Sequence, residues 1–200
     1  MTGVTPALWG GSNPRAGRIG HKAHNRGMMN PPSDPTGTLP AYHVLFYCMG
    51  NICRSPTAHG VFEARVRQAG MAAQVRVDSA GTHGYHVGAP PDARSQAHAL
   101  RRGYDLSGQR ARQLTAGDFE RFDLVLAMDW DNLALGEQLC PPEHRRKLRR
   151  FAEFFQRFEH TVVPDPYTGG PAGFELVLDL VEDGSEGLLR HVRQQLQPGG

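Results

Sequence analysis

The stretch Tyr42–Ala69, Y-H-V-L-F-Y-C-M-G-N-I-C-R-S-P-T-A-H-G-V-F-E-A-R-V-R-Q-A, decides the fold. Its first part, up to Tyr47, is a nearly continuous run of aromatic, aliphatic and β-branched residues, which is typical of a strand buried on both faces of a parallel sheet. From Ser55 onward the apolar residues recur at helical spacing, and Pro56 stands in the first turn, where a missing N–H is tolerated. The stretch therefore predicts a strand, a tight loop and a helix.

The loop 48–54 is a candidate oxyanion site, because a strand-to-helix turn aims backbone N–H groups and the positive helix end at one point. Cys48 ends the strand, and the planar guanidinium of Arg54 matches two phosphate oxygens. Helix ends and nearby cations stabilise a thiolate, so Cys48 is predicted to be a nucleophilic anion that the Ser55 hydroxyl can hydrogen-bond. Gly50 permits torsions that a bulkier residue would resist. A buried cysteine at a strand end often serves only as a small apolar residue, but this combination favours a phosphate site.

Further elements are predicted from pattern. Apolar and polar residues alternate over 74–79, which predicts a second strand that ends where 80–82 interrupt the pattern. A third buried strand is predicted over 122–128. A short fourth strand is predicted over 148–151, although the phenylalanines from 151 onward also fit helical spacing. Helices are expected from Asp92 to Gly103, from Asp129 onward, and over 174–196 with an interruption near Asp183 and Gly184.

The nonapeptide C-M-G-N-I-C-R-S-P at 48–56 resembles the signature of the low-molecular-weight protein tyrosine phosphatases, in which Cys, five residues, Arg and Ser follow one another. The resemblance covers about 42–196, through D-L-S-G-Q-R-A-R-Q-L at 105–114, F-D-L-V-L-A-M-D at 122–129 and D-P-Y at 165–167. It implies an α/β fold: a single three-layer domain with a four-stranded, twisted parallel sheet flanked by helices and a phosphate-binding loop after the first strand.

The resemblance also implies an activity, hydrolysis of phosphotyrosine monoesters through a cysteinyl phosphate. Cys48 would be the nucleophile, Arg54 would bind phosphate and stabilise the transition state, and Asp165 would be the general acid and base. Asp165 stands between two prolines, which hold it in a stiff turn. No metal or cofactor is required. The implied phosphate-binding residues are Met49, Gly50, Asn51, Ile52, Cys53 and Ser55, and the walls of the ring pocket are Tyr85 and Tyr167.

Some residues depart from the family pattern. Gln109 stands where a histidine often supports the loop, so the loop's hydrogen-bond network is expected to differ. Thr168 replaces an aromatic residue or glycine of many members, which predicts a more open rim. Arg110 and Arg112 are interpreted as ordinary solvated charges.

The 200 residues, 39% of them hydrophobic, are enough for one core. Residues 1–41 hold 7 Gly and 6 Pro, which predicts a disordered N-terminal extension, or a start codon assigned too early with Met28 or Met29 as the true start. The expected domain is 42–196, followed by a tail, 197–200. No run of 18 apolar residues suggests a membrane span, and no apolar signal region is present near the N-terminus.

Three cysteines, an odd and small number, argue against a disulfide framework and for a reducing compartment, so a cytoplasmic location is expected. Cys48 and Cys53 share one loop. A reversible disulfide between them would protect the nucleophile from over-oxidation; alternatively, Cys53 only packs the loop.

These residues argue against several other functions. Arsenate reduction on the same scaffold needs a relay of further cysteines, but 79–92 contain none and Cys140 stands alone. A related arginine phosphatase has Thr where this chain has Ile52. An inactive phosphate-binding or interaction module has no use for Asp165, and a nucleotide-binding loop would need Gly-Lys-Ser/Thr. The expected partner is a phosphotyrosine protein, and a bacterial tyrosine kinase is one candidate. Binding to nucleic acid or to a membrane is not expected. The protein is expected to be a monomer or weak dimer.

Overall fold

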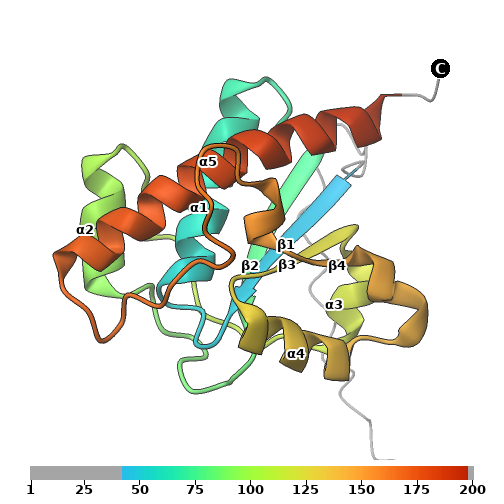
Figure 1. Ribbon diagram of the computed structural model, residues 1–200, viewed down its shortest axis with the longest axis horizontal. Coiled ribbons are helices and arrows are strands. Elements are labelled where there is room, and N and C mark those ends of the chain that lie inside the picture. The colour runs from blue at the N-terminus through green and yellow to red at the C-terminus, as the bar shows by residue number, and fades with distance from the viewer. Residues whose placement is uncertain (1–41, 198–200) are drawn as a thin grey trace, which may run out of the picture. The chain divides into compact units, whose positions relative to one another are not determined.

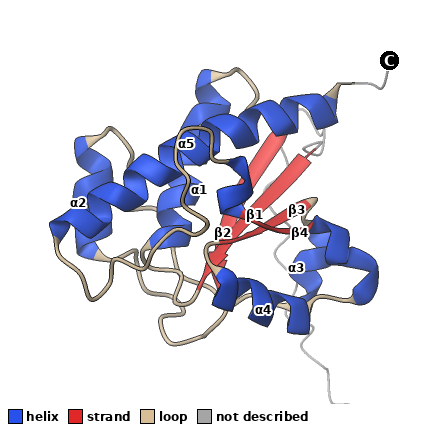
Figure 2. Cartoon of the chain, viewed as in Figure 1, coloured by secondary structure: helices blue, strands red, loops and turns tan. Residues whose placement is uncertain are grey.

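A sheet of four parallel strands with helices on both faces makes up residues 42–197, the part of the chain that this computed structural model describes (Figures 1 and 2). The predicted extension 1–41 and residues 198–200 of the predicted tail lie outside the described residues. The strand order is β2-β1-β3-β4, which confirms the predicted α/β fold. The strands are β1 (Tyr42–Cys48), β2 (Val75–Gly81), β3 (Leu124–Ala127) and β4 (Leu148–Arg150).

Five helices and two 3₁₀ turns surround the sheet in this part of the chain. They are α1 (Arg54–Gln68), α2 (Ala93–Arg101), α3 (Ala116–Arg121), α4 (Trp130–Leu139), η1 (Pro142–Lys147), η2 (Phe151–Phe154) and α5 (Pro171–Leu196). None of these helices is long and apolar enough to cross a bilayer.

The side chains of β1 alternate between two cores. Val44 and Phe46 face a cluster shared with α1 and α5, whereas Leu45 and Tyr47 face a second cluster shared with α3 and α4. All four are fully buried. Because a hydrophobic core covers each face of the strand, the side chains on both faces are apolar. This explains the continuous apolar run in the sequence.

Several sequence-based boundaries were wrong. Strand β2 continues through Gly81 instead of ending before Ala80, and β3 is shorter than the predicted 122–128. Helix α5 begins at Pro171 instead of Phe174 and is continuous where an interruption was expected. A Cβ at Gly184 would lie 2.7 Å from the ring of Phe151, so the glycine allows η2 to pack closely on α5. The neighbouring Asp183 carboxylate accepts hydrogen bonds from the backbone N–H groups of Gln156 and Arg157, at 2.8 and 3.1 Å. The two residues therefore join the helix to the segment that follows η2.

The uncertain segment after β4 combines both alternatives, since the strand ends at Arg150 and the helical turn η2 begins with Phe151. The helix α1 ends at Gln68, and Gly70 follows in the left-handed conformation at φ 69°, which favours glycine just past a helix end. The parallel strands β1, β2 and β3 end at one edge of the sheet, and the loops that follow them hold the site described next.

Candidate active site

The loop between β1 and α1 places a sulfur beside a hydroxyl that is itself held in position. Cys48 Sγ lies 3.1 Å from Ser55 Oγ. Asn51 Nδ2 donates to Ser55 Oγ and to Ser79 Oγ, both at 2.9 Å. Since Ser55 accepts from Asn51, its own proton is available for the sulfur of Cys48 or for the carbonyl oxygen of Ala80, 3.2 Å away. The hydroxyl is thus arranged to donate to a thiolate.

Asn51 also determines the path of the loop. It is the one non-glycine residue with positive φ in the described part of the chain, at 54°, and its Oδ1 accepts the backbone N–H of Arg112 at 2.9 Å. The guanidinium of Arg112 bonds to Asp78 and Asp118, at 2.9 and 3.1 Å, so its interpretation as a solvated charge was wrong. Arg110 is exposed, as expected.

The side chain of Gln109 bonds to helix α1. Gln109 Nε2 donates to the carbonyl oxygen of Pro56, 3.0 Å away, in the first turn of α1. The bonds beneath the loop itself come from the side chain of Asn51.

Arg54 is 3% exposed and holds two acidic side chains together. Its Nη2 donates to Asp165 Oδ2 at 2.7 Å, while Nη1 donates to Asp129 and, at 3.2 Å, to the carbonyl oxygen of Val163. Burial alone would lower the pKa of Arg54, but the nearby Cys48, Asp165 and Asp129 raise the pKa above its ordinary value. A permanent cation therefore lies beside the sulfur.

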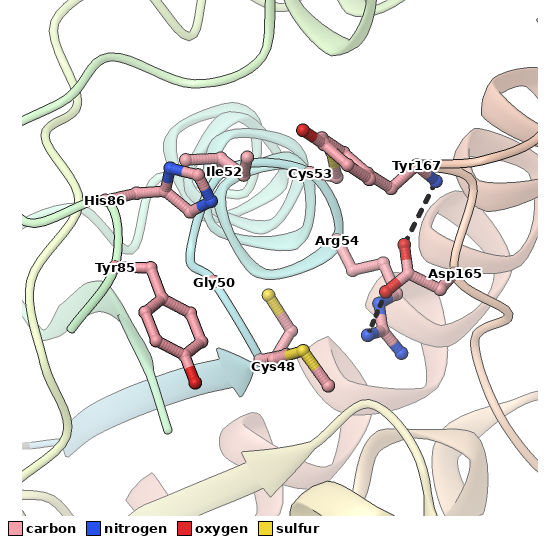
Figure 3. A pocket seen from close by; sticks show the side chains of 10 residues that line it. Cys48, Gly50, Ile52, Cys53, Arg54, Tyr85, His86, Asp165 and Tyr167 are labelled. Atoms are coloured by element: carbon pink, nitrogen blue, oxygen red, sulfur yellow. Dashed lines mark hydrogen bonds and ion pairs between the residues drawn. The ribbon is translucent and has the colours of Figure 1, made fainter. Parts of the chain in front are cut away.

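The predicted catalytic and ring-pocket residues come together around one opening (Figure 3). Tyr85 and Tyr167 lie on opposite sides of it, 76% and 50% exposed. Asp165 is oriented through both oxygens, because Oδ1 accepts the N–H of Tyr167 at 3.0 Å and Oδ2 contacts Arg54. Asn51 and Ser55 lie buried beneath the loop and do not line the opening. The lining residues are Cys48, Met49, Gly50, Ile52, Cys53, Arg54, Tyr85, His86, Asp165 and Tyr167.

Sequence reasoning gave no role to two residues of the site. His86 lines the pocket above Gly50, where an added Cβ would lie 3.0 Å from the imidazole. Its position next to Tyr85 was the available signal. Asp129 caps α4 by accepting the N–H of Asn132 at 2.6 Å and pairs with Arg54 through its other oxygen. Its place directly after the third strand, at the carboxyl edge of a parallel sheet, was the signal for a functional residue.

Cys140 lies apart from this pocket. It is buried at the end of α4, in the core cluster that contains Tyr47. Within residues 42–197, no group of three or more His, Cys, Asp or Glu side chains is arranged to hold a metal ion.

Comparison with known proteins agrees with this geometry. The family model described as "Low molecular weight phosphotyrosine protein phosphatase" matches residues 43–198. A putative low molecular weight protein-tyrosine-phosphatase of Synechocystis is 45% identical over 154 residues, which are 76% of this chain and 98% of the relative. The low molecular weight protein-tyrosine-phosphatase of Streptomyces coelicolor is 44% identical over 159 residues, 78% of this chain and 96% of the relative.

Solved structures show the same relationship. A protein tyrosine phosphatase of Entamoeba histolytica superposes with a TM-score of 0.76 at 35% identity, covering 78% of this chain and 99% of the other. YfkJ of Bacillus subtilis superposes with a TM-score of 0.75 at 33% identity, covering 80% and 100%. The chain belongs to the low molecular weight phosphotyrosine protein phosphatase family. It is a hydrolase, a protein-tyrosine phosphatase, and the place of Cys48 after the first strand fits the cysteine nucleophile of that reaction.

Proposed function

We propose that Cys48, Arg54 and Asp165 carry out the phosphatase reaction in two displacements. The thiolate of Cys48 attacks phosphorus, the bond from phosphorus to the tyrosine oxygen breaks, and Asp165 gives its proton to that oxygen. A cysteinyl phosphate results. Asp165, now a carboxylate, takes a proton from water, whose oxygen attacks phosphorus; the sulfur–phosphorus bond breaks, and phosphate and the thiolate are released. The observation that supports these roles is that all three side chains line one pocket.

The loop and Arg54 would stabilise the negative charge of the transferred phosphoryl group. The N–H groups of residues 49–54 and the guanidinium would hold the equatorial oxygens of the transferred group, so catalysis rests mainly on positioning and charge. The Ser55 hydroxyl, 3.1 Å from the sulfur, stabilises the thiolate as nucleophile and as leaving group. Phosphate must then take the place of a carboxylate at Arg54, and the more exposed partner is Asp165, at 47% against 23% for Asp129.

The ring pocket supports an aryl phosphate as substrate. Tyr85 and Tyr167 line the pocket on opposite sides, where their rings could contact the phenyl ring of a phosphotyrosine (Figure 3). The proposed substrate is therefore a tyrosine-phosphorylated protein, a bacterial tyrosine kinase being one candidate. The small, odd number of cysteines, Cys48, Cys53 and Cys140, is the basis for proposing action in a reducing compartment such as the cytoplasm. We further propose that the enzyme is a monomer or weak dimer, and that 42–196 form the catalytic domain.

The proposed roles are tested with p-nitrophenyl phosphate. Cys48→Ser is expected to abolish turnover, whereas Asp165→Ala should lower kcat by less than the factor of about 10²–10⁴ that a general acid usually contributes, because p-nitrophenol is a good leaving group. Cys140→Ala, which removes a thiol outside the pocket, is the control and should remain active. Near-normal rates for both Cys48→Ser and Asp165→Ala would refute the mechanism.

Two further experiments address the substrate and the domain boundary. The Asp165→Ala form should retain phosphotyrosine proteins, so a pull-down read by mass spectrometry would identify the substrate. A chain that starts at Leu39 should keep full activity if the extension is dispensable.

A further inference from the structure

Arg94, in the first turn of α2, is fixed to the segment that supports the phosphate loop. Its Nε and Nη2 donate to the two carboxylate oxygens of Asp92, at 3.0 and 2.9 Å. The backbone N–H of Asp92 in turn donates to the carbonyl oxygen of Ile52, 2.8 Å away. Because Ile52 belongs to the loop proposed to bind phosphate, Arg94 has a fixed position relative to that loop.

The same guanidinium holds the loop that carries the proposed acid. Arg94 Nη1 donates to the carbonyl oxygen of Tyr167 at 3.0 Å, and its central carbon lies 5.4 Å from the centroid of the Tyr167 ring. It also lies 4.8 Å from the ring centroid of Phe174, a buried residue of α5. Figure 1 shows the start of α5 beside α2, which explains how one side chain contacts both. Tyr167 is thus held through its carbonyl oxygen and its ring.

Tyr167 in turn restrains the side chain of Asp165. Its N–H donates to Asp165 Oδ1 at 3.0 Å, and the other carboxylate oxygen is bonded to Arg54. When substrate phosphate occupies the guanidinium of Arg54, the bond between Arg54 and Asp165 is the one that gives way. The orientation of Asp165 then depends on Tyr167, and through Tyr167 on Arg94.

We propose that Arg94 is a positioning residue, which keeps the general acid Asp165 and the ring of Tyr167 in a fixed position relative to the phosphate-binding loop. The inference rests on the proposed role of Asp165 as the proton donor. Arginine suits this task because its planar fork can bond in three directions and stack on aromatic rings at once, whereas lysine has a single compact charge. Arg94 does not line the pocket, so it acts through Tyr167 and Asp165 and not on the substrate.

A positioning role predicts a dependence on the leaving group. Phenol resembles tyrosine and leaves poorly unless it is protonated, whereas the more acidic p-nitrophenol depends less on the acid. Arg94→Ala should therefore lower kcat/KM for phenyl phosphate about tenfold, less than the 10²–10⁴-fold expected for loss of the acid itself. The loss for p-nitrophenyl phosphate should be clearly smaller. A general loss of folded enzyme would lower both values by the same factor.

The test measures kcat/KM for both substrates in the wild type, Arg94→Ala, Arg94→Lys and Arg101→Ala. Arg101 lies on the same helix and bonds to Glu175, so its variant is the matched control and should leave the ratio of the two values unchanged. Arg94→Lys should recover part of the ratio. An unchanged ratio in Arg94→Ala, or equal losses on both substrates, would overturn the inference, while a wild type inactive on p-nitrophenyl phosphate would instead refute the proposed function.

A double mutant makes the test independent of folding. If Arg94 acts through the acid, adding Arg94→Ala to Asp165→Ala should produce little further loss on phenyl phosphate, because the two effects share one cause. A full additional loss in the double mutant would contradict the positioning role. Asp92→Asn, which weakens the other end of the connection, should reproduce the shift in ratio seen with Arg94→Ala.

Discussion

Arg54 donates a hydrogen bond from Nη2 to Oδ2 of Asp165 over 2.7 Å, which pairs the proposed phosphate ligand with the proposed acid. If phosphate binds Arg54 as proposed, its oxygens compete with the Asp165 carboxylate for this part of the guanidinium. Asp129 holds the other edge. In the proposed mechanism, substrate binding would exchange one anion for another at Arg54 and would release Asp165 to face the leaving oxygen.

This competition predicts that Asp165→Ala binds inorganic phosphate more tightly than the wild type while turning over more slowly. The carboxylate is about half exposed, and pairs of that kind contribute about 1 kcal/mol or less, so the gain in affinity should be about fivefold at most. The competitive inhibition constant for phosphate measures it. Asp165→Asn keeps an oxygen acceptor but cannot act as an acid; it should be equally slow, with an intermediate constant. Weaker phosphate binding in Asp165→Ala would show that the two anions do not compete.

The left-handed backbone and the side chain of Asn51 should contribute separately to stability. Asn51→Ala removes the bonds to Ser55, Ser79 and the N–H of Arg112, each worth about 0.5–1.5 kcal/mol, and also places a Cβ-bearing residue without local hydrogen bonds at φ 54°. Asn51→Gly loses the same bonds but tolerates the torsion. Denaturant unfolding should therefore find the alanine variant about 1 kcal/mol less stable than the glycine variant. Equal stability of the two would mean that the loop relaxes to another conformation.

The sheet could be predicted because the sequence patterns that indicate its strands lie within short, continuous segments. The run ending at Tyr47 is apolar at every position that meets either core, and the change of period at Ser55 marks the helix. The error at Gly184 has a physical reason. Glycine usually weakens a helix, but here it admits the ring of Phe151, and only the tertiary contact reveals that role.

The grouping of residues in the candidate site was partly predictable for the same reason. Cys48, Arg54 and Ser55 lie within eight residues, so their convergence follows from one loop. Asp165 was found through its resemblance to a family segment, because it is 111 positions from Arg54. Asp129 is 75 positions from Arg54, and its role depends on β3 lying next to β1, which no local pattern states.

Close packing of α4 on the sheet predicts a size limit at Gly136. A Cβ there would lie 2.1 Å from the hydroxyl oxygen of Tyr47, whose side chain is fully buried. Gly136→Ala should therefore destabilise the fold by about 1–3 kcal/mol, as overpacking usually does. Gly108→Ala, where a Cβ meets nothing within 4 Å, is the control and should be nearly neutral.

Tyr47→Phe should relieve part of that clash. The Tyr47 hydroxyl has no hydrogen-bond partner among residues 42–197, so its removal alone should cost little. The double mutant Tyr47→Phe/Gly136→Ala should then be more stable than the sum of the single effects predicts, as measured by thermal or denaturant unfolding. Strict additivity would show that the clash is absorbed by movement of α4 instead.

The two cysteines of the phosphate loop should differ in reactivity. Burial raises the pKa of the Cys53 thiol to about 12, and the nearby acids Asp92 and Asp165 act in the same direction against a hydrogen bond with Ser95. The reactive thiolate of Cys53 would appear only as the pH rises towards that value, so at pH 7 it remains a thiol. Brief treatment with iodoacetamide should modify Cys48 and leave Cys53 intact, as peptide mapping by mass spectrometry would show.

Two controls separate the sites: phosphate should protect Cys48, and Cys48→Ser should leave the loop unmodified. Modification of Cys53 as fast as Cys48 at pH 7 would contradict the effect of burial.

The same difference in reactivity between the two cysteines predicts which of them is oxidised first when the proposed disulfide forms. Oxidation would begin at Cys48, whose sulfur lies beside Arg54 and Ser55, and Cys53 would then attack the resulting sulfenic acid. Because Cys53 is held as a thiol, this second step should accelerate with rising pH, which timed trapping of the sulfenic acid after peroxide treatment would measure.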